Sequence, residues 1–83
     1  MKILYFAWMR EHTGCSSEII DAPNEVQTIA DLAEYLRGRS AGHQTALRNL
    51  KTVRVAINRN YAGLDSPVRP DDEIAFFPPV TGG

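Results

Sequence analysis

The residues best suited to chemistry stand at the end of the sequence, AFFPPVTGG (75–83). Pro78 and Pro79 lack a backbone N–H, so a strand cannot continue through them and the chain must leave its sheet in extended form. Gly82 and Gly83 have no side chains and can thread a slot that admits only backbone. A terminal carboxylate is ionised at neutral pH and must be activated, for instance as an acyl adenylate, before it reacts as an electrophile. This pattern predicts a carrier arm with Gly83 as its reacting residue.

Other catalytic constellations are missing from the sequence. His12, His43 and Cys15 lack the spacing of a metal site, so we predict no metal. Cys15 lies near His12 in sequence, but no third group is placed to orient such a pair, and we expect a packed or solvated thiol. The acids of Asp71–Glu73 follow Pro70 and are typical of a turn. The glycines form no phosphate-binding loop, and we predict no cofactor bound by the chain itself.

Length and composition limit the class of protein. A chain of 83 residues builds one modest core, since so short a chain buries only about 60% of its unfolded surface. We expect one domain over residues 1–79 and a flexible tail over 80–83. With 9 basic and 10 acidic residues, the net charge of −1 argues against binding to nucleic acid or to a membrane surface. One cysteine permits no internal disulfide, and no signal or membrane-spanning segment is evident, so a cytoplasmic location is expected.

Hydrophobic periodicity predicts the order strand, strand, helix, strand, strand. The strands are expected at residues 2–8, 18–22, 53–58 and 74–77. A polar loop, REHTGCSS, joins the first two as a hairpin. The helix should start at Thr28, with Asp31 completing a capping box, and end at Gly38 or Gly42.

The connections and the overall fold follow from that order. Residues 40–52 form a connection with room for one helical turn around Leu47, and a short edge strand is expected near Val68. A compact solution is an α+β fold, in which a mixed sheet carries one main helix on one face. The first and last strands then lie parallel in its centre. This is the β-grasp, or ubiquitin-like, roll.

Alternation assigns each strand's side chains to a face of the sheet. The set predicted to face the helix comprises Ile3, Tyr5, Ala7, Val53, Val55, Ile57, Ile74 and Phe76. The set left on the open face comprises Leu4, Phe6, Ala56, Ala75 and Phe77, with Tyr61 at its border. A contiguous apolar set of this kind indicates a binding surface. Two alternatives stay open: the loop 60–69 covers part of this face, or the alternation is shifted by one residue. A frayed end is the alternative for the tail, and the aromatic face beside it favours the carrier.

Charge is unevenly distributed along the chain. No Asp or Glu occurs between Arg37 and Leu64, whereas six basic residues do: Arg37, Arg39, Arg48, Lys51, Arg54 and Arg59. A solvated basic face is the favoured interpretation, and a docking surface for an acidic protein is the alternative.

Three segments resemble the small, sulfur-carrier subunit of molybdopterin synthase: ILYFAWMREHTG (3–14), VRVAIN (53–58) and DDEIAFFPPVTGG (71–83). The resemblance covers both ends and the third strand, while the helical region matches in pattern alone. The long C-terminal motif is the specific part, since a final Gly-Gly is shared by all ubiquitin-like carriers. Asp71 is a departure, because this family often has glycine there; Asp tolerates left-handed backbone well, so the turn should persist.

This resemblance implies a reaction sequence. An ATP-dependent activating enzyme would adenylate the carboxylate of Gly83, and a sulfur donor would convert it to a thiocarboxylate. The carrier would then dock on the large catalytic subunit, in a heterotetramer of two small and two large subunits. There it would give sulfur to a pterin precursor, forming the dithiolene of molybdopterin. ATP would be used by the activating enzyme alone.

The resemblance also implies the binding residues. The partner-binding set comprises Phe6, Tyr61, Phe77, Pro78, Pro79, Val80 and Thr81. A carrier for another sulfur pathway such as thiamine, a ubiquitin-like protein modifier and a plain interaction module remain the alternatives.

Overall fold

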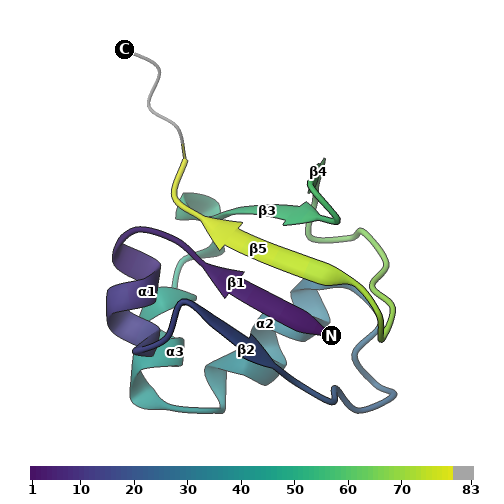
Figure 1. The fold of residues 1–83 in the computed structure, drawn as a ribbon, viewed down its shortest axis with the longest axis horizontal. Helices are drawn as coiled ribbons and strands as arrows, with labels where there is room; N and C mark the ends of the chain where they lie inside the picture. The colour runs from purple at the N-terminus through teal and green to yellow at the C-terminus, as the bar shows by residue number, and fades with distance from the viewer. Residues whose placement is uncertain (80–83) are drawn as a thin grey trace.

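The structure is a computed structural model, and it describes residues 1–79 (Figure 1). The predicted arm, 80–83, lies outside the described residues. The helices are α1 (Trp8–Thr13), α2 (Ile29–Arg37) and α3 (Ala41–Ala46), with a 3-10 turn at Leu50–Thr52. The strands are β1 (Lys2–Tyr5), β2 (Ser17–Ile19), β3 (Arg54–Ile57), β4 (Asn60–Ala62) and β5 (Glu73–Phe77).

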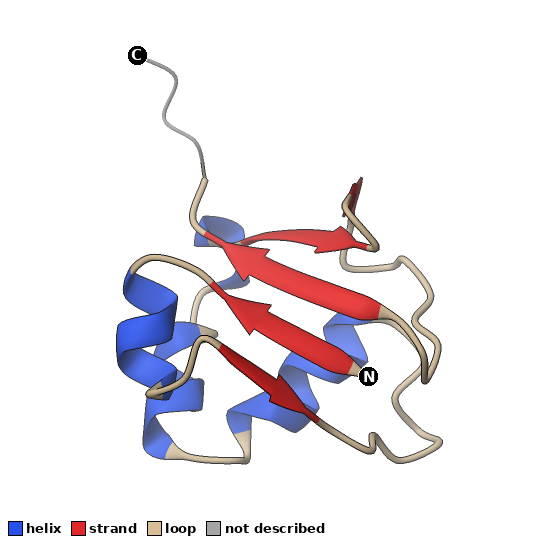
Figure 2. Ribbon diagram, viewed as in Figure 1, coloured by secondary structure: helices blue, strands red, loops and turns tan. Residues whose placement is uncertain are grey.

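The five strands form one mixed sheet in the order β2-β1-β5-β3-β4. β1 and β5 are parallel neighbours in its centre, and the other pairs are antiparallel. Helix α2 crosses behind this sheet (Figure 2). This arrangement confirms the predicted β-grasp fold.

Helix α2 begins and ends where the sequence predicts. The Asp31 amide donates to the Thr28 hydroxyl at 3.2 Å, and the Thr28 amide donates to the Asp31 carboxylate at 3.2 Å. The amide of Gln27 donates to the same carboxylate, and these hydrogen bonds hold the pKa of Asp31 below its usual range. The helix stops at Gly38. Its apolar side is fully buried and consists of Ile29, Leu32, Ala33 and Leu36.

The burial of side chains confirms the predicted inward-facing set at every position except one. The inward set of the two central strands, Ile3, Tyr5, Ile74 and Phe76, is at most 1% exposed. Val53 and Val55 are buried as well, and Ile57 packs against the core at its margin. Ala7 was predicted to point inward and is exposed. It lies beyond the end of β1, with φ 55° and ψ −134°, and so no longer follows the alternation of the strand.

The segment after Ala7 is the first clear error of the sequence prediction. Residues 8–13 form helix α1, where a strand end and a polar loop were expected. Met9 is fully buried, so this helix packs on the core even though its other residues are exposed or partly exposed and mostly polar. Gly14 closes it in the left-handed conformation, and its amide donates to the Arg10 carbonyl at 3.0 Å. β1 and β2 are antiparallel as predicted, but α1 separates them.

The second error concerns the connection after α2. It contains the six-residue helix α3, capped by Ser40, rather than a single turn around Leu47. The amide of His43 donates to the Ser40 hydroxyl at 3.0 Å. Gly42 lies inside this helix and does not end α2. It stands against α1, where an added Cβ would lie 1.8 Å from the carbonyl oxygen of His12.

The edge strand also differs in position. It is β4, which follows β3 through a tight turn in which Asn58 and Arg59 have φ of 50° and 72°. Near the expected position a single bridge joins Thr28 to Pro67. The neighbouring loop is bonded to the start of α2, since the Ala30 amide donates to the Leu64 carbonyl at 2.9 Å. β2 is likewise shorter than predicted and covers Ser17–Ile19 instead of 18–22.

Candidate functional site

The open face of the sheet carries a continuous apolar row across four strands. Leu4 of β1 pairs with Ala75 of β5, Ala75 with Ala56 of β3, and Ala56 with Tyr61 of β4. Residues directly opposite each other on paired strands share a face. The two alanines therefore form a low floor between the larger side chains of Leu4 and Tyr61.

A second row lies nearer the point where the chain leaves the sheet. The β1–β5 pairing continues past Tyr5, because the Phe6 amide donates to the Phe76 carbonyl at 3.1 Å. This continuation sets Phe6 beside Phe77, and Phe77 pairs with Arg54 on its other side. Phe6 is 46% exposed, whereas Phe77 is half-buried.

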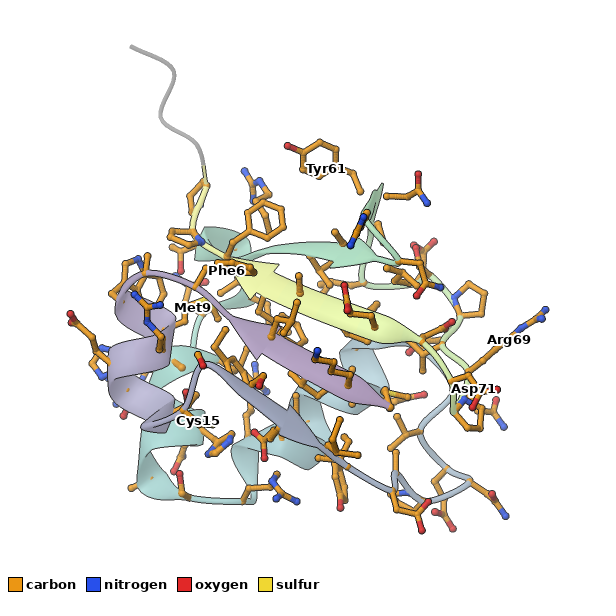
Figure 3. The ribbon with its side chains drawn as sticks, in the orientation of Figure 1. Phe6, Met9, Cys15, Tyr61, Arg69 and Asp71 are labelled. Carbon is orange, nitrogen blue, oxygen red and sulfur yellow. The ribbon has the colours of Figure 1, made fainter. Side chains whose placement is uncertain are left out.

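Tyr61 joins the two rows. Its side chain is 81% exposed, and its ring centroid lies 5.9 Å from that of Phe77, with the planes tilted by 51°. In Figure 3, Phe6 lies near the C-terminal end of β5, and Tyr61 lies beside β4. We call the apolar surface made by both rows the docking face; it comprises Leu4, Phe6, Ala56, Tyr61, Ala75 and Phe77.

The structure excludes both alternatives to an open apolar face. The loop 60–69 does not cover it, because the hydrogen bonds of residues 64, 66 and 68 join that loop to the start of α2, in the helical layer. The alternation is not shifted, because Ile74 and Phe76 are the buried residues of β5. Accessible aromatic rings next to small residues are typical of surfaces that bind a protein partner.

The docking face ends at Phe77, and two residues separate it from the predicted arm. Pro78 and Pro79 follow Phe77 directly and are half-buried. The predicted arm itself, Val80, Thr81, Gly82 and Gly83, lies outside the described residues. Any protein that covers Phe77 would therefore reach the two prolines that lead into the arm.

On the opposite face, a polar network centres on Glu18, which the sequence prediction did not single out. One carboxylate oxygen of Glu18 accepts from the Tyr5 hydroxyl at 2.8 Å and lies 2.7 Å from His43 Nε2. Arg39 Nε lies 3.1 Å from the other oxygen. Burial by itself raises the pKa of Glu18, but the hydrogen bonds from His43 and Tyr5 and the charge of Arg39 outweigh it and lower that pKa. The network ties β1 and β2 to α3.

Tyr5 and His43 make further contacts within this network. Burial, together with the hydrogen bond to the Glu18 carboxylate, raises the pKa of Tyr5. The Ser40 hydroxyl lies 2.7 Å from His43 Nδ1, so both ring nitrogens have polar partners. The ring of His43 meets that of Tyr5 edge-on at 5.6 Å.

Cys15 lies at the edge of the same network. It is half-buried, and its Sγ is 4.0 Å from Glu18 Oε2. The nearby histidine is His43, since the exposed His12 packs against Trp8 at 6.0 Å. Donor atoms of Cys15, Glu18 and His43 all lie within 4.8 Å of one another, a set that sequence spacing did not indicate. The Arg39 charge already pairs with Glu18 and would repel a second cation, which favours a structural role.

None of the described helices is long and apolar enough to cross a membrane.

Solved structures with this architecture are ubiquitin-like proteins. SAMP1 from Haloferax volcanii superposes with a TM-score of 0.80 and 26% identity, over 100% of this chain and 98% of that chain. Subunits 1 and 2 of molybdopterin-converting factor from Helicobacter pylori were solved as a complex, and its matching chain gives a TM-score of 0.64 at 22% identity. That match covers 99% of this chain and 96% of that one. The fold thus defines a ubiquitin-like β-grasp protein.

Sequence comparison is more specific. The model of the ThiS family matches residues 3–83. The molybdopterin synthase sulfur carrier subunits of Escherichia coli and Haemophilus influenzae are 35% and 39% identical to this chain over 83 residues. Each alignment covers 100% of this chain and 99% of the relative. The chain belongs to the ThiS family.

Proposed function

We propose that this protein is the sulfur carrier subunit of a molybdopterin synthase. The observation that carries the proposal is the aromatic docking face, which ends at the residue where the arm leaves the sheet. That the carrier transfers sulfur is supported by relatives that match over the full chain and are named molybdopterin synthase sulfur carrier subunits.

The chemistry takes place at Gly83. An activating enzyme joins its carboxylate to the AMP moiety of ATP and releases pyrophosphate. A sulfur donor displaces AMP and leaves a thiocarboxylate. The pterin precursor takes that sulfur, and water supplies the oxygen that restores the carboxylate. The domain itself supplies no catalytic side chain and no bound cofactor; it delivers the arm. In the cell we expect this cycle in the cytoplasm.

The docking face determines where the arm can reach. Phe77 is fixed in β5, and the six residues from Pro78 to Gly83 extend beyond it. A partner that binds the docking face therefore receives the arm within six residues' reach, about 20 Å when fully extended. The activating enzyme and the large synthase subunit need the same face and arm, so one must release the carrier before the other binds it.

Intact mass tests the proposal directly. The protein, incubated with its activating enzyme, ATP and a sulfur donor, should exchange one oxygen for one sulfur, and fragmentation should place the sulfur on Gly83. A variant that lacks Gly83 and a variant with one residue appended should remain folded and gain no sulfur. An unchanged mass of the wild-type protein would contradict the carrier function.

A protein modifier is the second candidate, because SAMP1, whose structures also carry the name small archaeal modifier protein 1, shares the fold at 26% identity. It is not favoured, since the sulfur carrier subunits are more similar in sequence, at 34–39% identity for three of them. Discrete conjugates of higher mass, attached through Gly83 in cell extracts, would favour the modifier.

A further inference from the structure

Arg54 is a charged residue placed among the aromatic side chains of the docking face. It lies directly opposite Phe77 in the β3–β5 ladder and is exposed. It shares the open side of β3 with Ala56, because residues two apart on a strand point to the same side. Phe77 is therefore flanked by an aromatic ring, Phe6, on one side and by a guanidinium on the other.

No acidic side chain among residues 1–79 forms an ion pair with this guanidinium. Within the same residues, the Arg54 side chain makes one hydrogen bond, in which Nη1 donates to the carbonyl oxygen of Lys51 at 3.3 Å. The ion pairs among residues 1–79 involve Arg37, Arg39 and His43, and none includes Arg54. Its own strand and the adjacent turns hold no acid, since Asp and Glu are absent between Arg37 and Leu64.

Docking would bury this charge. Arg54 and Ala56 lie on the open side of β3, the strand between β5 and β4; Arg54 pairs with Phe77 and Ala56 pairs with Tyr61. A protein that covers Phe77 therefore also reaches Arg54, its direct neighbour in the ladder. An arginine that loses its water without gaining an anion is strongly unfavourable, whereas a carboxylate can accept two parallel hydrogen bonds from it.

We propose that the large synthase subunit presents a carboxylate to Arg54, inside an otherwise apolar contact with the docking face. This inference rests on the proposed function and names a chemical feature of its partner. Arginine suits the role because its planar fork binds a carboxylate in one orientation. The pair would fix the angle at which the carrier sits, and hence the direction in which the arm enters the partner.

The test measures the affinity of the full-length protein for the large subunit of the same organism, by calorimetric titration at low and high salt. The variants are Arg54→Leu, which keeps the bulk without charge, and Arg54→Glu, which reverses the charge. Arg48→Glu is the matched control, because Arg48 is exposed and follows α3 in the helical layer, away from the docking face. All variants should unfold in urea like the wild type, since both positions are exposed.

Arg54→Leu should weaken binding by about 30-fold or more, even though it enlarges the apolar surface. Arg54→Glu should weaken it by at least about 100-fold, and Arg48→Glu only slightly. Equal or tighter binding by Arg54→Leu would contradict the proposed pairing of Arg54 with a carboxylate of the large subunit. Equal losses from Arg48→Glu and Arg54→Glu would also overturn it, because they would indicate long-range attraction instead of a pair.

The outcomes separate this inference from the function on which it rests. A wild-type protein that binds the large subunit and transfers sulfur, beside an unimpaired Arg54→Leu variant, contradicts the pairing alone. A wild-type protein that neither binds the subunit nor acquires sulfur contradicts both.

Discussion

The rings of Tyr61 and Phe77 lie 5.9 Å apart, and this contact links the edge strand β4 to the central strand β5. Tyr61 is 81% exposed, so a partner is needed to bury it. Phe77 directly precedes Pro78, the first of the two prolines that lead into the arm. The energetic centre of docking is therefore expected at Phe77, with Tyr61 as its neighbour.

Replacing Phe77 by Asp should weaken binding to the large subunit by at least about 2 kcal/mol, because it buries a charge where an aromatic anchor stood. Tyr61→Ala should cost about 1–2 kcal/mol. Ile19→Asp is the control, since Ile19 is 74% exposed on the edge strand β2 and lies outside the docking face. Calorimetric titration measures all three. Similar losses from Ile19→Asp and Phe77→Asp would contradict the assigned face.

Gly42→Ala should destabilise the protein by at least about 2 kcal/mol, because its Cβ would overlap the His12 carbonyl, which is backbone and has little freedom to move. Gly38→Ala is the matched control: its Cβ would meet the Tyr35 carbonyl oxygen at an ordinary 3.5 Å. That variant should be neutral or slightly stabilised, by less than about 1 kcal/mol. Urea unfolding compares the two. Equal stability would mean that α1 and α3 do not approach as closely as described.

Ala7→Gly should stabilise the protein. The conformation of Ala7, φ 55° and ψ −134°, is unfavourable for a residue with a Cβ, and such strain costs about 1–3 kcal/mol. Glycine relieves it at an entropic cost of about 0.5–1 kcal/mol, so we expect a net gain of about 1 kcal/mol. Ala7→Val at the same position should be destabilising, because branching at Cβ increases the strain. Urea unfolding should rank the variants Gly, Ala, Val, and the reverse order would contradict the strained turn.

The Glu18 network should make the free energy of unfolding depend on pH in the acidic range. The pKa of Glu18 is lowered in the folded state, so the stability that it contributes is fully present above its unfolded-state value of 4.5. That contribution is lost as the pH falls through the lower folded-state pKa. Glu18→Gln should therefore reduce stability at pH 7 and lessen the loss between about pH 5 and pH 3.

Unfolding in urea across that pH range measures the effect. Glu25→Gln is the control, because Glu25 is exposed and makes no recorded hydrogen bond or ion pair among residues 1–79. The wild type and Glu25→Gln should show the same pH dependence. A Glu18→Gln variant with that same dependence would mean that the network does not hold the carboxylate in its charged form.

Local patterns in the sequence were sufficient to predict much of the fold. Alternation in VRVAIN and EIAFF assigned the faces of β3 and β5 because side chains on a strand point alternately to opposite sides. Thr28 and Asp31 predicted the start of α2 because a capping box needs only neighbouring residues. The two prolines likewise marked the end of β5.

The tertiary structure decided what depends on distant residues. Helix α1 has one buried side chain, Met9, and its polar sequence gave no clear helical periodicity. Glu18 and His43 meet through α3, although 25 positions separate them. Arg54 became a neighbour of Phe77 only through the β3–β5 register, which no local pattern specifies. The sequence by itself therefore predicted the arm and determined the character of the faces. Strand pairing, which brings together segments far apart in the chain, decided that a single arginine stands where the docking face meets the arm.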